Sequence, residues 1–410
     1  MKKQLINLLC IAGIAFGSAS CDFLDVVPDN VATIENAFAN ELEARKYLAT
    51  IYSYLPHHDK FNNNIALMGS DEITSWHILT LDNQITPIRL VTGDQNRNSP
   101  ILSYWSGDNN GRNYHEAIHD CNVFIENVSD ESKIYDLTPS DRRRWLGEAY
   151  FLRAFYYFHL VRLFGEVPII NHEVTDLTMV QTEKSSVAQV YEQIVSDLKL
   201  AIGNLPVSNA NGRAHYYAAK ALLGKVYLQM AGEPLEDSEA AALAEVELNE
   251  VIQSGRFELV KDYFSLFDAS NEYSSEYLFD VEFANNGTTT YGGQVGTIDG
   301  VQTPNNLYWS AVWSTQEFYE TYDPADLRRD NIARFKYVYD DNQNLVKEDL
   351  SSEPIYYAYK FRHALTEEGR GPGWANWANP INFPIIRYAD VLLMYAEAVW
   401  RAHEVPSPEA

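Results

Sequence analysis

The segment 115–119 places three residues where they could do metal chemistry. His115, Glu116 and His119 form the pattern H-E-x-x-H. On a helix, two imidazoles four residues apart share a face, so they could bind zinc while the glutamate acts as a general base. The sequence offers no clear third ligand, because Glu148 is close only along the chain. The neighbouring residues instead fit the inward face of an ordinary helix: Tyr114, Ile118, Cys121, Asn122 and Ile125. A zinc peptidase is therefore kept only as an alternative.

Aromatic side chains indicate a second kind of chemistry, which is binding without catalysis. The 410 residues include 27 tyrosines, 18 phenylalanines and 8 tryptophans. Flat rings stack on the apolar faces of sugars, while Asp, Asn and Arg side chains hydrogen-bond sugar hydroxyls. The same rings also suit thick helical packing, so composition alone leaves both uses open.

Charge and missing motifs narrow the possible ligands. The 57 acidic residues outnumber the 31 basic ones, and the net charge is -26. The negative electrostatic field of such a chain repels the phosphate backbone of DNA or RNA, which excludes nucleic acid as a partner. The sequence has no nucleotide-binding loop and no G-x-S-x-G motif, and we expect no cofactor. Asp340, Asn342 and Asn344 alternate like calcium ligands, but Leu345 and Ser351 replace the required Gly and Glu, so a hairpin turn is predicted.

The N-terminus has the three parts of a bacterial lipoprotein signal. Two lysines follow Met1, residues 5–16 are apolar, and small residues at 17–20 precede Cys21. The apolar stretch is too short for a permanent membrane helix. We expect residues 1–20 to be removed and Cys21 to carry the lipid that anchors the mature chain. An ordinary secretory signal, with Cys21 incidental, is the alternative. Cys121 is then a lone thiol, so no intrachain disulfide is expected.

Helices must position most of these residues. Apolar periodicity predicts them at about 35–55, 112–128, 139–164, 187–203, 213–231, 238–254 and 388–403. Thr138 is expected to cap the helix that starts at Pro139, and Gly165 lies beyond its end. Ser314 and Glu317 predict a capping box for a short helix reaching residue 322.

The helix pairs carry parts of a tetratricopeptide pattern. L-G-x-x-Y, typical of the first helix of such a pair, occurs at 146–150 and again at 223–227. Small residues at these positions let two helices approach closely, which favours a stacked αα scaffold. After residue 255 the pattern changes, since 277–283 alternates like a strand and 332–339 with 355–361 could form a hairpin.

The predicted fold is therefore mainly α, a tetratricopeptide-like αα superhelical scaffold with an irregular, loop-rich and small-β subregion. Residues 21–410 are expected to form one domain. The helical repeats lie at about 35–255 and 385–405, and the loop-rich insertions lie at about 57–111 and 265–385.

Several segments together carry a resemblance to one family. Cys21-Asp-Phe-Leu-Asp25, followed by Pro28, is similar to the mature start of SusD/RagB-type outer-membrane lipoproteins of the Bacteroidetes. Residues 148–154, 163–169 and 221–227 resemble the helix signatures of that family, and 383–398 resembles its most specific segment. Family members usually continue well past this last segment, so we expect the C-terminal part of the family fold to be missing here.

The resemblance implies a glycan-binding lipoprotein of the outer membrane, facing the cell exterior. It would capture oligosaccharide or polysaccharide and deliver it to a TonB-dependent transporter of the SusC type, and no catalysis is implied. In the family, the glycan site comes from loops after the first helix and loops of the second half. The matching candidates here are Asp71, Trp76, His77, Arg89 and Trp105 in the first group, and Tyr291, Tyr308, Trp309 and Trp313 in the second.

Each aromatic candidate has an alternative interpretation as a lid over the core, and Trp105 could lie at the entry of the next helix. Trp145 and Trp400 fall within predicted helices and are expected in the core. The alternative is that the chain is a peptide-binding, RagB-like member of the same family, because a groove lined by aromatic residues can also bind the side chains of a peptide.

Overall fold

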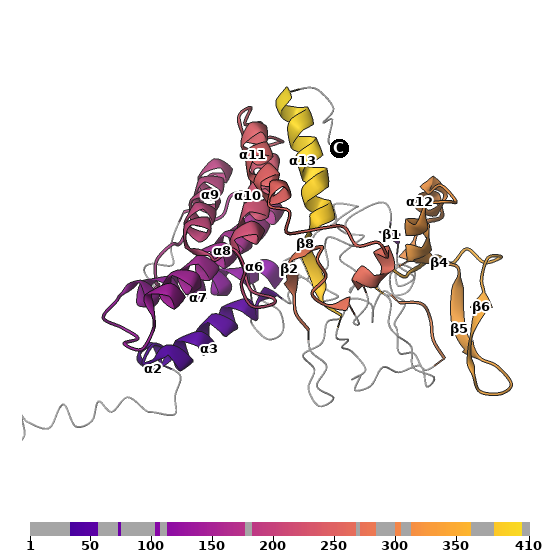
Figure 1. Ribbon diagram of the computed structural model, residues 1–410, viewed down its shortest axis with the longest axis horizontal. Helices are drawn as coiled ribbons and strands as arrows, with labels where there is room; N and C mark the ends of the chain where they lie inside the picture. The colour runs from indigo at the N-terminus through magenta and orange to yellow at the C-terminus, as the bar shows by residue number, and fades with distance from the viewer. Residues whose placement is uncertain are drawn as a thin grey trace, which may run out of the picture.

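The computed structural model describes residues 33–55, 73–74, 103–106, 113–176, 183–267, 271–283, 300–304, 313–361 and 381–403. Helices dominate these ranges and gather on one side, while most short strands lie on the other (Figure 1). The helices are α2 (Ile34–Ala37), α3 (Glu41–Tyr52), α6 (Ser103–Ser106), α7 (Tyr114–Ser129), α8 (Pro139–Phe164), α9 (Val187–Asn204), α10 (Tyr216–Met230), α11 (Ala240–Gln253), α12 (Gln316–Thr321) and α13 (Tyr388–His403). The mainly α prediction is confirmed.

Local capping residues explain where the two long helices α8 and α9 begin. The Thr138 hydroxyl accepts a hydrogen bond from the backbone N–H of Asp141, 3.1 Å away, and Gly165 ends α8 with a φ of +70°. At α9, Ser186 and Gln189 each accept a hydrogen bond from the other's backbone N–H. These contacts satisfy N–H groups that have no partner inside the helix.

Two predicted boundaries are wrong for the same kind of local reason. The first helix is divided into α2 and α3, because the side chain of Asn40 accepts from the N–H of Glu43 and starts a new helix. The cap of α12 is Thr315, whose hydroxyl accepts from the N–H of Phe318, whereas Ser314 belongs to a strand. In each case the helix begins at a capping side chain that was not predicted from the sequence, Asn40 for α3 and Thr315 for α12.

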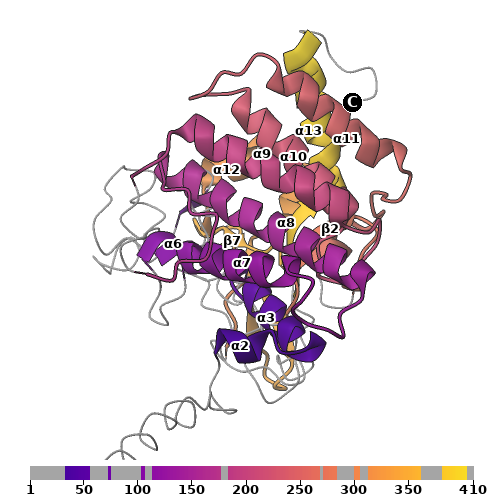
Figure 2. The ribbon, with the colours of Figure 1, turned by 90° about the vertical axis from the view of Figure 1, so that its left-hand side faces the viewer.

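Successive helices pack against one another to form the scaffold. Helices α7 to α11 follow each other across it, and α13 lies against α11 (Figures 1 and 2). Trp145 is 1% exposed inside the main hydrophobic core, as predicted. Trp400 is 58% exposed, so its prediction is wrong. Helix α13 buries the face that carries Val391 and Ala398, and Trp400 lies on roughly the opposite face. None of the described helices is long and apolar enough to cross a membrane.

The close approach of α10 and α11 depends on Gly224. A Cβ atom at this position would lie 2.5 Å from Cγ of Leu248 on α11. We expect Gly224→Ala to lower the free energy of unfolding by about 1–3 kcal/mol, because the core cannot accept the added methyl without moving. Urea unfolding followed by circular dichroism measures the change.

Gly203 in α9 is the matched control for this substitution. A Cβ atom there would meet nothing within 4 Å, and alanine forms helices better than glycine by up to about 1 kcal/mol. Gly203→Ala should therefore leave stability unchanged or raise it. Equal effects of the two alanine variants would contradict the packing argument.

The strands form small sheets beside the helices. A four-stranded sheet has the order β1 (Ile73–Thr74), β3 (Trp313–Ser314), β7 (Tyr357–Ala358) and β4 (Ile332–Ala333). Two further pairs are β2 (Tyr277–Val281) with β8 (Phe383–Arg387), and β5 (Phe335–Tyr339) with β6 (Leu345–Asp349). The predicted strand at 277–283 is confirmed.

The predicted hairpin between 332–339 and 355–361 is only half right. Strand β4 does pair with β7, but β5 pairs with β6, which follows it directly in the chain. The turn between β5 and β6 is the predicted one, and the carboxylate of Asp340 accepts from the backbone N–H groups of Asn342 and Asn344 at 2.8 Å. The tight turn at 340–344 therefore pairs β5 with β6, the strand that follows it directly.

Candidate functional site

The pairing of β1 with β3 joins two parts of the chain that contain predicted ligand-binding residues. The strands are antiparallel, with Ile73 opposite Ser314 and Thr74 opposite Trp313. In sequence, Asp71 and Trp76 each lie two residues from β1, and Trp309 lies four residues before β3. Two segments about 240 residues apart along the chain thus meet in one sheet.

Trp313 is the member of the second predicted group that the structure describes. Its ring lies nearly perpendicular to that of Tyr357, with centroids 5.8 Å apart. The side chain is half-buried and packs against a small core that contains Val301, Ala333 and Leu350. Part of the indole therefore stabilises this sheet, and part remains accessible.

Trp105 is the member of the first predicted group that the structure describes. It lies in α6, half-buried, with its ring centroid 4.5 Å from that of His115 and 5.2 Å from that of Phe164. Both contacts are edge-on, a geometry that stabilises aromatic pairs. Trp105 thus fixes α6 against α7 and the end of α8.

The other predicted ligand-binding residues lie outside the described ranges. They are Asp71, Trp76, His77, Arg89, Tyr291, Tyr308 and Trp309, and the lipidation candidate Cys21 lies outside them as well. Their roles remain predictions.

The H-E-x-x-H segment forms the first turns of α7. His115 packs edge-on against Trp105, and burial lowers the pKa of its imidazole. Glu116 is exposed, and its backbone N–H donates to the Asn113 side chain that caps the helix. Within the described ranges, no three His, Cys, Asp or Glu side chains are grouped so as to hold a metal ion. The inward face predicted for this helix is confirmed, since each of its residues is buried: Tyr114, Ile118, Cys121, Asn122 and Ile125.

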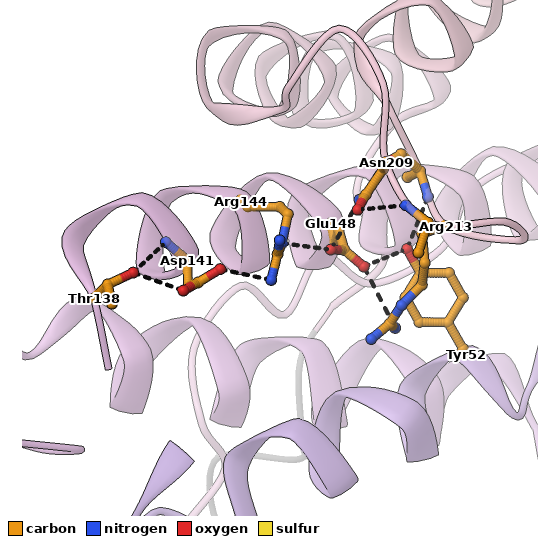
Figure 3. Close-up of polar contacts among 9 residues, drawn as sticks. Tyr52, Thr138, Asp141, Arg144, Glu148, Asn209 and Arg213 are labelled. Atoms are coloured by element: carbon orange, nitrogen blue, oxygen red, sulfur yellow. Dashed lines mark hydrogen bonds and ion pairs between the residues drawn. The ribbon is translucent and has the colours of Figure 1, made fainter. Parts of the chain in front are cut away.

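A buried carboxylate, Glu148, joins three parts of the scaffold (Figure 3). This α8 residue is 1% exposed and accepts hydrogen bonds from the Tyr52 hydroxyl at 2.8 Å and the Asn209 amide at 3.1 Å. Arg213 forms an ion pair with it at 3.4 Å, and Arg144 approaches to 3.8 Å. Burial raises the pKa of Glu148, whereas Arg213 and these hydrogen bonds oppose that rise. The cluster was not predicted from the sequence, although Glu148 stands directly before the apolar residues 149–152, where an acid is unusual.

Beside this cluster lies a cavity of about 250 Å³. Loop 207–213, residues 256–257 and 273–274, and strand β2 form its walls. Asp280 of β2 lines it, is 6% exposed and accepts from the amide of Asn382 at 3.0 Å. Burial, and secondly the charge of Glu282, raise the pKa of Asp280 to about 7. The cavity therefore contains a carboxyl group that is partly protonated at neutral pH.

We expect Asp280→Asn to stabilise the protein above neutral pH. Unfolded Asp280 loses its proton near its ordinary pKa of 3.8, whereas the folded protein retains it up to about 7. The free energy of unfolding of the parent therefore falls as pH rises between these two values. Asparagine cannot ionise and so removes this loss. The free energy of unfolding of the variant should therefore exceed that of the parent by about 4 kcal/mol at pH 8 and match it near pH 4. Thermal unfolding at several pH values measures the difference, and a gap that stays constant with pH would contradict the assignment.

Comparison with known proteins identifies the family. A SusD-like family model described as "Starch-binding associating with outer membrane" matches residues 22–228, and the SusD family model matches residues 279–404. A SusD-like protein of Formosa agariphila is 29% identical over 334 residues, which cover 75% of this chain and 62% of that protein. The chain therefore spans less than two thirds of that relative.

Solved structures show the same relationship in the fold. A SusD superfamily protein from Parabacteroides distasonis superposes with a TM-score of 0.74 and 25% identity, over 90% of this chain and 78% of that one. A laminarin-binding SusD-like protein gives a TM-score of 0.71 and 25% identity, over 89% of this chain and 82% of its own. The first family model alone matches half of the chain, the two together match most of it, and the chain belongs to the SusD family.

Proposed function

We propose that this chain binds oligosaccharide or polysaccharide at the outer surface of the outer membrane and delivers it, without turnover, to a TonB-dependent transporter of the SusC type. The observation that carries the proposal is the β1–β3 pairing, because it joins the two chain segments whose aromatic and polar residues are predicted to contact glycan. The laminarin-binding relative supports a sugar as the class of ligand.

The chemistry of the two segments fits a sugar. Trp76, Trp309 and Trp313 supply indoles that can stack on the apolar face of a pyranose ring. Asp71 and Arg89 supply an acceptor and donors for its hydroxyls. No proton transfer is needed to bind a sugar in this way, so the site requires no catalytic pair.

A ligand panel tests the proposal. Affinity electrophoresis of the mature protein through gels containing laminarin, starch, xyloglucan or levan should show retardation by at least one polysaccharide. Peptides of varied sequence, measured by calorimetry, form the second arm. Binding to peptides with no retardation by any polysaccharide would replace the proposal with the peptide-binding alternative.

Lipid anchoring at Cys21 is the second part of the proposal. We expect Cys21→Ala to give a folded protein that carries no acyl chains, because the acyl chains attach through that thiol. Metabolic labelling with a fatty-acid probe measures the modification. Cys121→Ala is the control, since this buried free thiol lies in α7 and should leave labelling unchanged. Parental labelling of the Cys21→Ala variant would contradict the assignment.

A further inference from the structure

We propose that the cavity between loop 207–213 and strand β2 is a second binding site, which takes one uncharged sugar ring. Its walls come from the loop between α9 and α10, from residues 256–257 and 273–274, and from strand β2, and neither β1 nor β3 contributes to them. The site is therefore separate from the glycan site proposed at the β1–β3 sheet, and it does not depend on that site.

The buried part of the cavity offers a hydrogen-bond acceptor. Asp280 is 6% exposed, and within the part of the chain that the structure describes, Asn382 is the one side chain that hydrogen-bonds its carboxyl group. Carboxyl oxygens can accept more than one hydrogen bond, so the group retains capacity for a ligand hydroxyl. Buried polar groups of this kind fix the orientation of small ligands in a pocket.

Tyr273 supplies an aromatic ring at the edge of the cavity. It lines the cavity while 53% exposed, and its φ of +64° is in the left-handed region that tyrosine rarely adopts. Burial, and secondly the charge of Glu282, raise the pKa of its hydroxyl. Unfavourable backbone conformations persist where surrounding contacts impose them, and they concentrate at ligand-binding positions. The backbone conformation thus places an exposed ring at the edge of the cavity that Asp280 also lines.

The charges around the cavity favour a ligand without a net charge. Arg213 and Arg256 both line it. Arg213 is already paired with Glu148, while Arg256 stands over the Tyr217 ring and forms no ion pair with any described carboxylate. The guanidinium groups disfavour a cation, and the neighbouring acids Glu272 and Glu282 disfavour an anion. A polyhydroxylated ring can use the donors of Arg256 and the acceptor of Asp280 together.

The size of the cavity limits the ligand to a single ring. Pockets for drug-sized molecules measure about 300–1,000 Å³. The present volume, about 250 Å³, lies below that range. A monosaccharide, or the terminal unit of a longer chain, fits this volume. The ring of Tyr273, the carboxyl group of Asp280 and the guanidinium of Arg256 line the cavity and are available to contact it.

Saturation-transfer NMR of the mature protein with glucose, galactose, mannose and N-acetylglucosamine tests this site. At least one of these sugars should show transfer, and titration calorimetry should give its dissociation constant. Asp280→Asn and Tyr273→Ala should each raise that constant about tenfold. Tyr135→Ala, which changes a tyrosine 86% exposed outside the cavity lining, should leave it unchanged.

Variants at the proposed glycan site distinguish binding there from binding in the cavity. Trp76→Ala and Trp309→Ala should leave monosaccharide binding at the parental level. Monosaccharide binding that needs Asp280 and Tyr273, without binding of any polysaccharide, would support the cavity and refute the proposed function. Absence of saturation transfer from all four sugars, or parental binding in both cavity variants, would overturn the inference whatever the polysaccharide panel shows.

Discussion

Replacing Asp197 with asparagine is expected to lower the free energy of unfolding by about 3–5 kcal/mol. Asp197 of α9 receives two hydrogen bonds from Arg153 of α8, at 2.8 and 2.6 Å. The same guanidinium donates to the Asn122 side chain of α7 at 2.8 Å. The Arg153 and Asp197 side chains are 6% and 1% exposed, so asparagine would leave a buried cation without its counter-charge. Three helices of the scaffold depend on this one pair.

Chemical denaturation of the Asp197→Asn variant measures the loss. An exposed pair gives the matched control, because Glu43 and Lys46 lie 2.7 Å apart with side chains 38% and 63% exposed. Glu43→Gln removes the same kind of charge and should cost less than about 1 kcal/mol. Similar losses in the two variants would contradict the view that the buried pair holds α7, α8 and α9 together.

Removing both Trp76 and Trp309 is expected to have the largest effect on ligand binding. Loss of one indole from a preformed platform removes about 1–3 kcal/mol of binding free energy. If the two rings contact different parts of the glycan, the double alanine variant should bind about 30-fold more weakly or worse. Calorimetry with the polysaccharide fragment selected by the panel measures the affinity, and the melting temperature should stay at the parental value.

Two other tryptophans serve as controls for the platform variant. Trp145→Ala should lower stability by about 3–5 kcal/mol through cavity formation, because this indole is 1% exposed in the core. Trp400→Ala should change neither stability nor affinity by much, because Trp400 is 58% exposed on α13. Parental affinity in the Trp76 and Trp309 double variant would place the glycan site elsewhere.

The helices could be predicted from sequence because their signals are local. Thr138 and Ser186 cap α8 and α9 where the sequence places them, and α13 spans the predicted 388–403. Each boundary depends on a side chain and a backbone N–H three residues apart, so a short window of sequence contains the whole interaction.

The contacts between distant segments could not be predicted in the same way. The pairing of β1 with β3 and the cluster around Glu148 join residues separated by many tens of positions, and no periodicity encodes such pairs. The prediction for Trp400 failed for a related reason, since helical periodicity defines faces but does not say which face meets a neighbour. For the candidate site, the sequence identified suitable residue types, and the β1–β3 pairing supplied the proximity of the two segments.

A crystal structure of the mature chain with its best-binding oligosaccharide would show whether the two segments that meet at the β1–β3 pairing bind glycan. We expect sugar rings stacked on indoles from both sides of the β1–β3 pairing, with Trp76 from the first segment and Trp309 or Trp313 from the second in contact with the ligand. Hydrogen bonds from Asp71 or Arg89 to the sugar hydroxyls should accompany the stacking. An oligosaccharide bound away from both segments, with these indoles packed against protein, would contradict it.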